Sequence, residues 1–115
     1  MKTIFHITSI ADWEKVKSDG SYRAASLEKD GFIHCSLALQ IPPVADYNFK
    51  GRQGLVLLEI DQKKLTHEVR FEDLYESGED YPHIYGPLNT DAVLRVVPFP
   101  PQPDGTFLLP RELVD

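Results

Sequence analysis

The stretch Gly31-Phe32-Ile33-His34-Cys35-Ser36 is typical of a short buried strand that is entered through a glycine and ends in polar residues. It contains a histidine, a serine and the only cysteine of the chain. Two other segments also place a histidine among apolar or aromatic residues, namely Phe5-His6-Ile7-Thr8 and the stretch from Tyr81 to Leu88. Titratable side chains inside apolar strands are a common sign of a functional site. The sequence therefore predicts a site that these three segments build together.

The size and composition of the chain predict one soluble globular domain. The chain has 115 residues, 42% of them hydrophobic and 26% charged, which suits a single modest core. We expect one domain over residues 1–115, with the Pro-rich residues 98–115 as a C-terminal extension packed on it.

Charge and cysteine content narrow the functional class. The net charge of −6 argues against capture of duplex nucleic acid. No apolar run approaches the ~20 residues that span a bilayer, so no membrane interaction is expected. A single cysteine cannot form an internal disulfide, which favours a reducing, cytoplasmic setting.

Hydrophobic periodicity predicts an α+β domain with a small mixed or antiparallel sheet and two short helices. Leu55 to Ile60 is a continuous apolar run and therefore the expected central strand. One helix is capped by Ser9 and ends near Ser18, and the other ends at Phe49. The remaining expected strands are Thr3–Thr8, Phe32–Ser36, Val69–Glu72, Ala92–Val97 and an edge strand at Phe107–Leu109.

Two of the three segments share a pattern of histidine, one residue, hydroxyl. In His6-Ile7-Thr8 and His34-Cys35-Ser36 the imidazole and the hydroxyl lie two positions apart, so on a strand they face the same side. Imidazoles can act as acid and base, and hydroxyls can bind oxyanions, which would suit a sugar, a phosphate or a phosphodiester. The alternative is that these histidines are structural and that each is satisfied by a backbone carbonyl.

In the third segment, His83 and Tyr85 share strand parity and could wall a pocket. We predict no metal site, because His34 and Cys35 are adjacent and should face opposite sides, although a site of three histidines stays open. Cys35 is expected to be a buried structural thiol, and Arg70 and Glu72 are expected to form a surface ion pair.

Taken together, the motifs resemble the domain of unknown function 952 family, whose members have no established activity. The resemblance covers nearly the whole chain. It rests on Phe5-His6-Ile7-Thr8, Trp13, Gly20, Tyr22, Ser26-Leu27, Gly31 to Ser36, Gln40, Leu58, Ile60-Asp61 and His83 to Leu88. It implies a split-sheet domain of the ADP-ribosyltransferase-like fold, which binds NAD in a cleft between two small sheets.

The resemblance also implies roles for individual residues. His6 and Thr8 would hold a ribose, and His34 and Ser36 would face the nicotinamide or a phosphate, with His34 and His6 as the catalytic pair. The walls of the cleft would be Tyr22, His83 and Tyr85. Members of the wider superfamily have a glutamate, on a later strand, as the third site residue. At the matching position this sequence has Ile84 or Tyr85, neither of which is an acid.

These observations lead to three functional hypotheses. The first is a small protein with a histidine-lined cleft that binds or transforms NAD, ADP-ribose or a phosphorylated nucleotide end. The second is a non-enzymatic module that binds a partner and uses its histidines structurally. The third is a two-histidine phosphoesterase.

Overall fold

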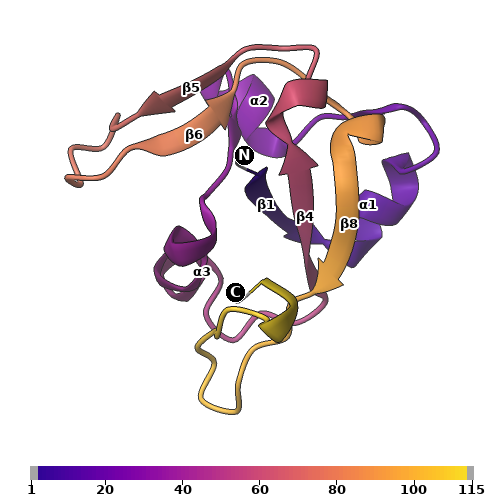
Figure 1. Ribbon diagram of the computed structural model, residues 1–115. Coiled ribbons are helices and arrows are strands. Elements are labelled where there is room, and N and C mark those ends of the chain that lie inside the picture. The colour runs from indigo at the N-terminus through magenta and orange to yellow at the C-terminus, as the bar shows by residue number, and fades with distance from the viewer. Residues whose placement is uncertain (1–2, 114–115) are drawn as a thin grey trace.

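The computed structural model describes residues 3–113, which fold into three small antiparallel sheets with helices around them (Figure 1). The largest sheet has the strand order β1-β4-β8. Its strands are β1 (Thr3–Ser9), β4 (Leu55–Asp61) and β8 (Val93–Pro98). The α+β class with small antiparallel sheets is thus confirmed.

Strand β4 is the centre of this sheet, as its continuous apolar run predicts. Leu57, Leu58 and Ile60 are fully buried because β4 pairs on both edges and is covered on both faces. The register of β4 against β8 shifts between Glu59 and Ile60, which marks a bulge in the pairing.

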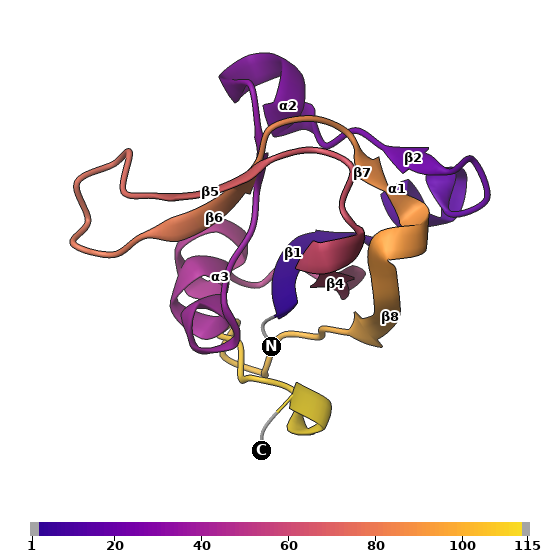
Figure 2. The ribbon, with the colours of Figure 1, turned by 45° about the horizontal axis from the view of Figure 1, so that its top comes forward.

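The other two sheets lie beside the first, and one of them carries His34 and His83. One has the order β3-β6-β5, with β3 (Ile33–His34), β6 (Tyr81–Ile84) and β5 (Val69–Glu72). The other pairs β2 (Ser21–Tyr22) with β7 (Leu88–Asn89). The β5–β6 hairpin projects from the body of the molecule (Figures 1 and 2). A single bridge, in which the backbones of Phe5 and Ser36 exchange two 2.8 Å hydrogen bonds, joins the edge of β1 to the segment after β3.

Three α-helices are present among the described residues, where the sequence analysis expected two. The predicted ones are α1 (Ile10–Val16), whose cap Ser9 accepts from the Asp12 amide, and α3 (Ile41–Phe49). The additional helix α2 (Ala25–Asp30) buries no residue of its own, so it gives no periodic apolar signal. Four short 3₁₀ turns complete the elements: η1 (Ala38–Gln40), η2 (Gln62–Lys64), η3 (Thr90–Ala92) and η4 (Arg111–Leu113). Within residues 3–113, no helix has the length and apolar character needed to cross a membrane.

Two strand predictions need correction. Only Ile33 and His34 of the predicted strand 32–36 are paired as a strand. Phe107–Leu109 is not a strand, because the Phe107 amide donates to the Asp46 carboxylate at 2.8 Å instead of to a neighbouring strand. Conversely, the broken stretch from Tyr81 to Leu88 supplies all of β6 and the start of β7.

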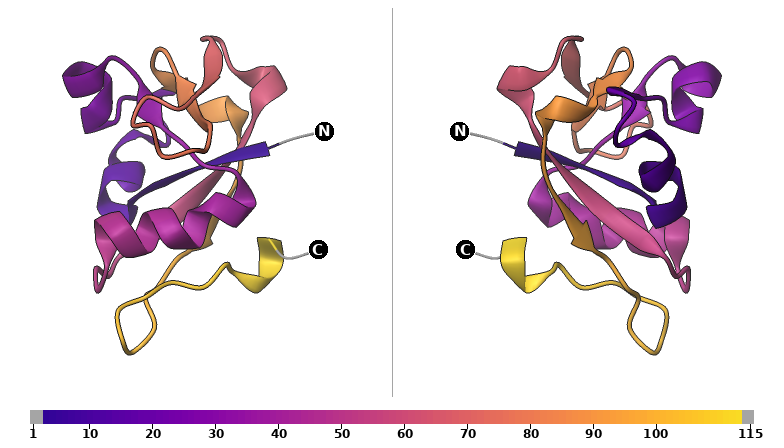
Figure 3. Two further views of the ribbon diagram at one scale, coloured as in Figure 1. Left: turned by 90° about the vertical axis from the view of Figure 1, so that its left-hand side faces the viewer. Right: turned by 90° about the vertical axis from the view of Figure 1, so that its right-hand side faces the viewer.

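Each face of the β1-β4-β8 sheet has its own core. One core contains Trp13, which is buried as the expected helix anchor, together with Ile4, Leu58 and Ile60. The other lies under α3 and the C-terminal segment, and its residues include Phe5, Leu57, Phe99 and Phe107. The C-terminal segment runs past α3 and beneath the sheet (Figure 3).

The Phe99–Phe107 stack allows a test of this second core. The two rings lie 4.8 Å apart and Phe99 is 1% exposed, so Phe99→Ala should lower the free energy of unfolding by about 3–5 kcal/mol. Urea denaturation measures the loss. Tyr47→Ala, at a side chain that is 90% exposed, is the control and should change stability by less than about 0.5 kcal/mol. An equal effect of both changes would contradict the described packing.

Candidate functional site

A buried chain of hydrogen bonds begins at His6 on β1. The Nδ1 atom of His6 lies 2.7 Å from the carbonyl oxygen of His34, and Nε2 lies 2.9 Å from the Tyr22 hydroxyl. Because a carbonyl can only accept, Nδ1 carries the proton, and Nε2 of the neutral ring accepts from Tyr22. The Tyr22 hydroxyl has a single proton, which it gives to His6. The Thr8 hydroxyl, 3.0 Å away, therefore donates to the Tyr22 oxygen and completes the chain.

Burial keeps this chain neutral. Desolvation lowers the pKa of His6 to about 4, and burial also raises the pKa of the Tyr22 hydroxyl. His6, Thr8 and Tyr22 are each at most 7% exposed, and the ring nitrogens and both hydroxyls have partners. The chain therefore holds the backbone of β3 at the His34 carbonyl and does not itself face solvent.

A second group is separate from this chain and is built around His34 and His83. These residues are direct partners in the register of β3 and β6. Their ring centroids are 5.5 Å apart and the rings are nearly perpendicular, at 81°. Two imidazoles from distant parts of the chain are thus held side by side by strand pairing.

A carboxylate orients each of these imidazoles. Asp30, at the end of α2, lies 3.0 Å from Nε2 of His34, and Glu72, at the end of β5, lies 2.9 Å from Nδ1 of His83. Glu72 also accepts a 2.5 Å hydrogen bond from the Tyr85 hydroxyl. The bonds from Tyr85 and His83 lower the pKa of Glu72, so this carboxylate is ionised at neutral pH.

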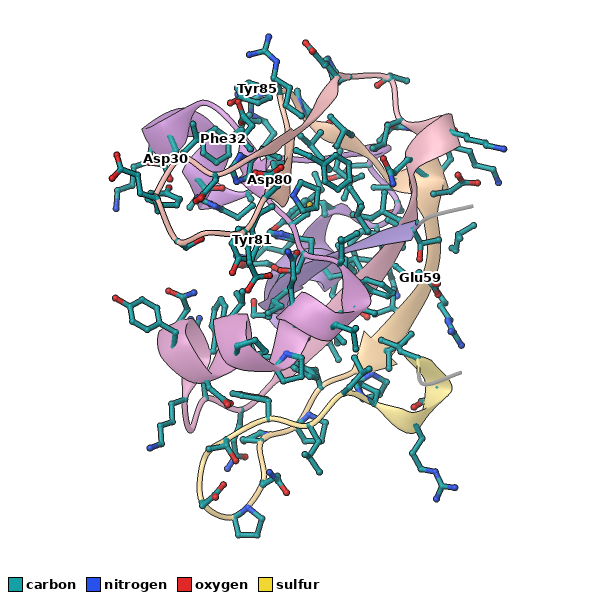
Figure 4. All side chains as sticks on the ribbon, turned by 60° about the vertical axis from the view of Figure 1, so that its left-hand side comes forward. Asp30, Phe32, Glu59, Asp80, Tyr81 and Tyr85 are labelled. Carbon is teal, nitrogen blue, oxygen red and sulfur yellow. The ribbon has the colours of Figure 1, made fainter. Side chains whose placement is uncertain are left out.

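The pair is open to solvent on the His34 side. The His34 side chain is 41% exposed, whereas His83 is 2% exposed and stacks on Phe32 at 4.1 Å between centroids. The other ring nitrogen of His83, Nε2, has no hydrogen-bond partner among residues 3–113. This atom keeps some contact with solvent. The Tyr75 ring lies 6.1 Å from His34. Asp30, Phe32 and Tyr85 gather in the same part of the molecule, far from Glu59 (Figure 4).

This arrangement is suited to acid–base chemistry. Imidazole takes up and releases protons near neutral pH, and a carboxylate on one ring nitrogen fixes the orientation of the other. Two such pairs in contact could remove a proton from one group of a ligand and deliver a proton to another.

All but one of the predicted site residues fall into two groups. His34, His83 and Tyr85 lie together in the open group, and His6, Thr8 and Tyr22 form the buried chain. The imidazole of His6 contacts the backbone of His34, not its ring. Ser36 belongs to neither group: it is buried, and its backbone pairs with Phe5.

Sequence reasoning missed three members of the open group, Asp30, Phe32 and Glu72. The predicted Arg70–Glu72 ion pair is wrong, because Arg70 binds Glu68 at 3.0 Å and lies over the Tyr85 ring at 4.5 Å. Glu72 instead faces β6, where it binds the partners described above. Strand parity with Arg70 placed Glu72 on the correct face, but the identity of its neighbours depends on the β5–β6 register.

The remaining candidates have simpler roles. Cys35 is buried as expected, and burial raises the pKa of its thiol. Within the described part of the chain, no group of three or more His, Cys, Asp or Glu side chains could hold a metal ion. Two hollows in the surface lie away from the histidine pair. One, of about 430 Å³, is beside Pro100–Pro103, and the other, of about 340 Å³, is beside Lys15 and Arg23.

Comparison with known proteins agrees with the motif pattern. Residues 7–96 match the family described as Protein of unknown function (DUF952). This chain belongs to that family. A search of curated proteins found no significant match.

Solved structures show the same fold in protein CC0527 from Caulobacter crescentus. In one crystal structure of CC0527, the sequence is 32% identical to this chain and the TM-score is 0.86. The match covers 96% of this chain and 97% of that one. A crystal structure of a double mutant of CC0527 is 31% identical, with a TM-score of 0.85 and the same coverage. The solution NMR structure is 33% identical, with a TM-score of 0.81, and covers 95% of this chain and 94% of that one.

The lowered pKa of His6 predicts a dependence of stability on pH. Its folded pKa, about 4, lies below the unfolded value of 6.5, so the unfolded chain binds more protons between these values. The contribution is present above pH 6.5 and is lost as the pH falls. His6 alone should therefore remove about 2 kcal/mol of stability between about pH 7 and pH 4.5.

The difference in unfolding free energy between the protein and His6→Gln, measured at both pH values, isolates this effect. Glutamine does not titrate, and every other group is common to both proteins. A difference that stays constant from about pH 7 to pH 4.5 would show that His6 is not held neutral by burial.

Proposed function

We propose that this protein binds an NAD-type or ADP-ribose-type nucleotide at the His34–His83 pair and acts on it by acid–base catalysis, in the manner of ADP-ribosyltransferase-like proteins. The observation that carries the proposal is the contact of two imidazoles, each oriented by its own carboxylate, at a site that is open on the His34 side.

The chemistry of the group suits the bond that joins ribose to nicotinamide. Cleavage of a glycosidic bond develops positive charge on the sugar, and an ionised carboxylate stabilises that charge. Glu72 is such a carboxylate, and it is 21% exposed beside His83. The open imidazole of His34 could take the proton of the attacking hydroxyl.

Glu72 also supplies what the sequence pattern lacked. Members of the wider superfamily place a glutamate on a later strand, and the β5–β6 hairpin brings Glu72 to the histidine pair from such a strand. This agreement supports the superfamily assignment as part of the proposal.

An exposed aromatic side chain beside the pair offers a surface for a planar ring. Tyr75 is 64% exposed next to His34, whereas Phe32 is buried, stacks on His83 and lies 5.3 Å from the Tyr85 ring. Tyrosine and phenylalanine faces favour stacking with flat groups such as nicotinamide or adenine.

Ligand binding can be tested by thermal shift with NAD, ADP-ribose, nicotinamide and nucleoside 2′- or 3′-phosphates. A ligand at 100 times its Kd adds about 2.7 kcal/mol, which raises Tm visibly in a domain of this size. The shift with NAD or ADP-ribose should vanish in His34→Ala and weaken in Tyr75→Ala. Tyr47→Ala, at an exposed tyrosine on α3, is the matched control and should keep it.

The outcomes separate the candidate functions. A shift that survives in His34→Ala would contradict the proposed site. The direct pairing of two imidazoles also favours a phosphoesterase, and hydrolysis of a cyclic phosphodiester with no response to NAD would favour it over the proposal. The absence of any shift would favour a partner-binding module.

Catalysis has its own test at Glu72. Glu72→Gln keeps the size of the side chain and an acceptor oxygen for Tyr85, but it removes the charge. We expect the rate at which nicotinamide is released from NAD to fall by about 100-fold or more, while the thermal shift persists. Chromatography measures the released nicotinamide. An unchanged rate would remove Glu72 from the reaction.

A further inference from the structure

The tip of the β5–β6 hairpin exposes two large apolar side chains on a projecting loop. Leu74 is 50% exposed and Tyr75 is 64% exposed, and the hairpin that carries them extends from the body of the molecule (Figures 1 and 2). Scattered exposed hydrophobic residues are normal, but adjacent ones on a projecting loop are typical of an interaction surface.

The same region carries most of the net negative charge of the protein. Residues 68–80 contain six carboxylates and one arginine, which gives −6 + 1 = −5 at neutral pH, against −6 for the whole chain. The six carboxylates are those of Glu68, Glu72, Asp73, Glu76, Glu79 and Asp80. The apolar tip is therefore surrounded by a concentrated negative field.

Hydrogen bonds hold the loop in one shape before any partner arrives. The Asp73 carboxylate accepts from the backbone amides of Ser77 and Gly78, each at 2.8 Å, and these bonds lower the pKa of Asp73. Gln40 ties the returning limb to η1 through Glu79 and the carbonyl of Asp80. A preformed loop loses little conformational entropy on binding.

We propose that the hairpin tip, defined by Leu74, Tyr75 and Glu76, is a docking surface for a positively charged polypeptide segment that also carries apolar side chains. Lysine or arginine side chains would meet the carboxylates, and apolar side chains would cover Leu74 and Tyr75. Nucleic acids, anionic membranes and a second copy of this chain all carry negative charge and are repelled by the same field.

The position of the tip gives the docking a consequence. The Tyr75 ring lies 6.1 Å from the ring of His34, so a segment bound at the tip would lie beside the open imidazole. The docking surface itself needs no nucleotide and does not depend on the proposed function.

The test uses two short fluorescent peptides, one of alternating lysine and leucine and one of alternating glutamate and leucine. Fluorescence anisotropy should show binding of the lysine peptide alone, and the affinity should fall as salt rises from about 50 to 300 mM. Leu74→Ser and Glu76→Lys should each weaken binding about tenfold. Matched controls away from the hairpin are Leu94→Ser on β8 and Glu112→Lys in η4, both of which should leave binding unchanged.

Three outcomes would overturn the proposal. The first is equal binding of the lysine peptide to the protein, the tip variants and the control variants. The second is no binding of the lysine peptide at all. The third is a concentration-dependent dimer in sedimentation that Leu74→Ser dissociates, because the tip would then contact a second copy. Leu74→Ser and Glu76→Lys should keep the thermal shift with NAD, so the docking surface and the nucleotide site can fail independently.

Discussion

One buried imidazole connects all three sheets. His6 belongs to β1, donates from Nδ1 to the backbone of β3, and accepts at Nε2 from the Tyr22 hydroxyl of β2. Only the neutral ring can do both, because a protonated imidazole has no acceptor. Burial, which disfavours the charged form, is therefore what makes the connection possible. Loss of the ring would leave the His34 carbonyl without this partner, at a cost of about 1–3 kcal/mol, and the Tyr22 hydroxyl would keep only its bond to Thr8.

His6 and the His34–His83 pair have different surroundings. Thr8, Tyr22 and His6 form a buried chain without charge. His34 and His83 each meet a carboxylate that is at least partly exposed. The buried chain holds the backbone of the strand on which His34 sits, and a ligand can reach the pair from the His34 side. The same residue type thus serves structure in one place and is available for chemistry in the other. The difference lies in the partners of each imidazole, which are a carbonyl and a hydroxyl for His6 and carboxylates for His34 and His83.

Local signals in the sequence predicted local structure well. The apolar run of β4 identified the central strand, and Ser9 identified the start of α1. Alternation along β1 placed His6 and Thr8 on one face. What could not be predicted depends on contacts between distant segments. The pairing of His34 with His83 follows from the register of β3 and β6, which are separated by about half the chain. Likewise, Asp30 and Glu72 resemble ordinary turn and surface residues until the fold brings them to the imidazoles.

The buried position of the single cysteine makes its thiol a probe of local opening. Cys35 separates His34 from Ser36, its amide bonds to the Pro82 carbonyl, and its thiol is buried. Thiols react as thiolates, and burial disfavours that form here, so a thiol-specific reagent has access only when the core around Cys35 opens. The rate of labelling would then report how often this part of the fold opens. The chain carries, without any engineered label, an intrinsic probe of the motions beneath its histidine pair.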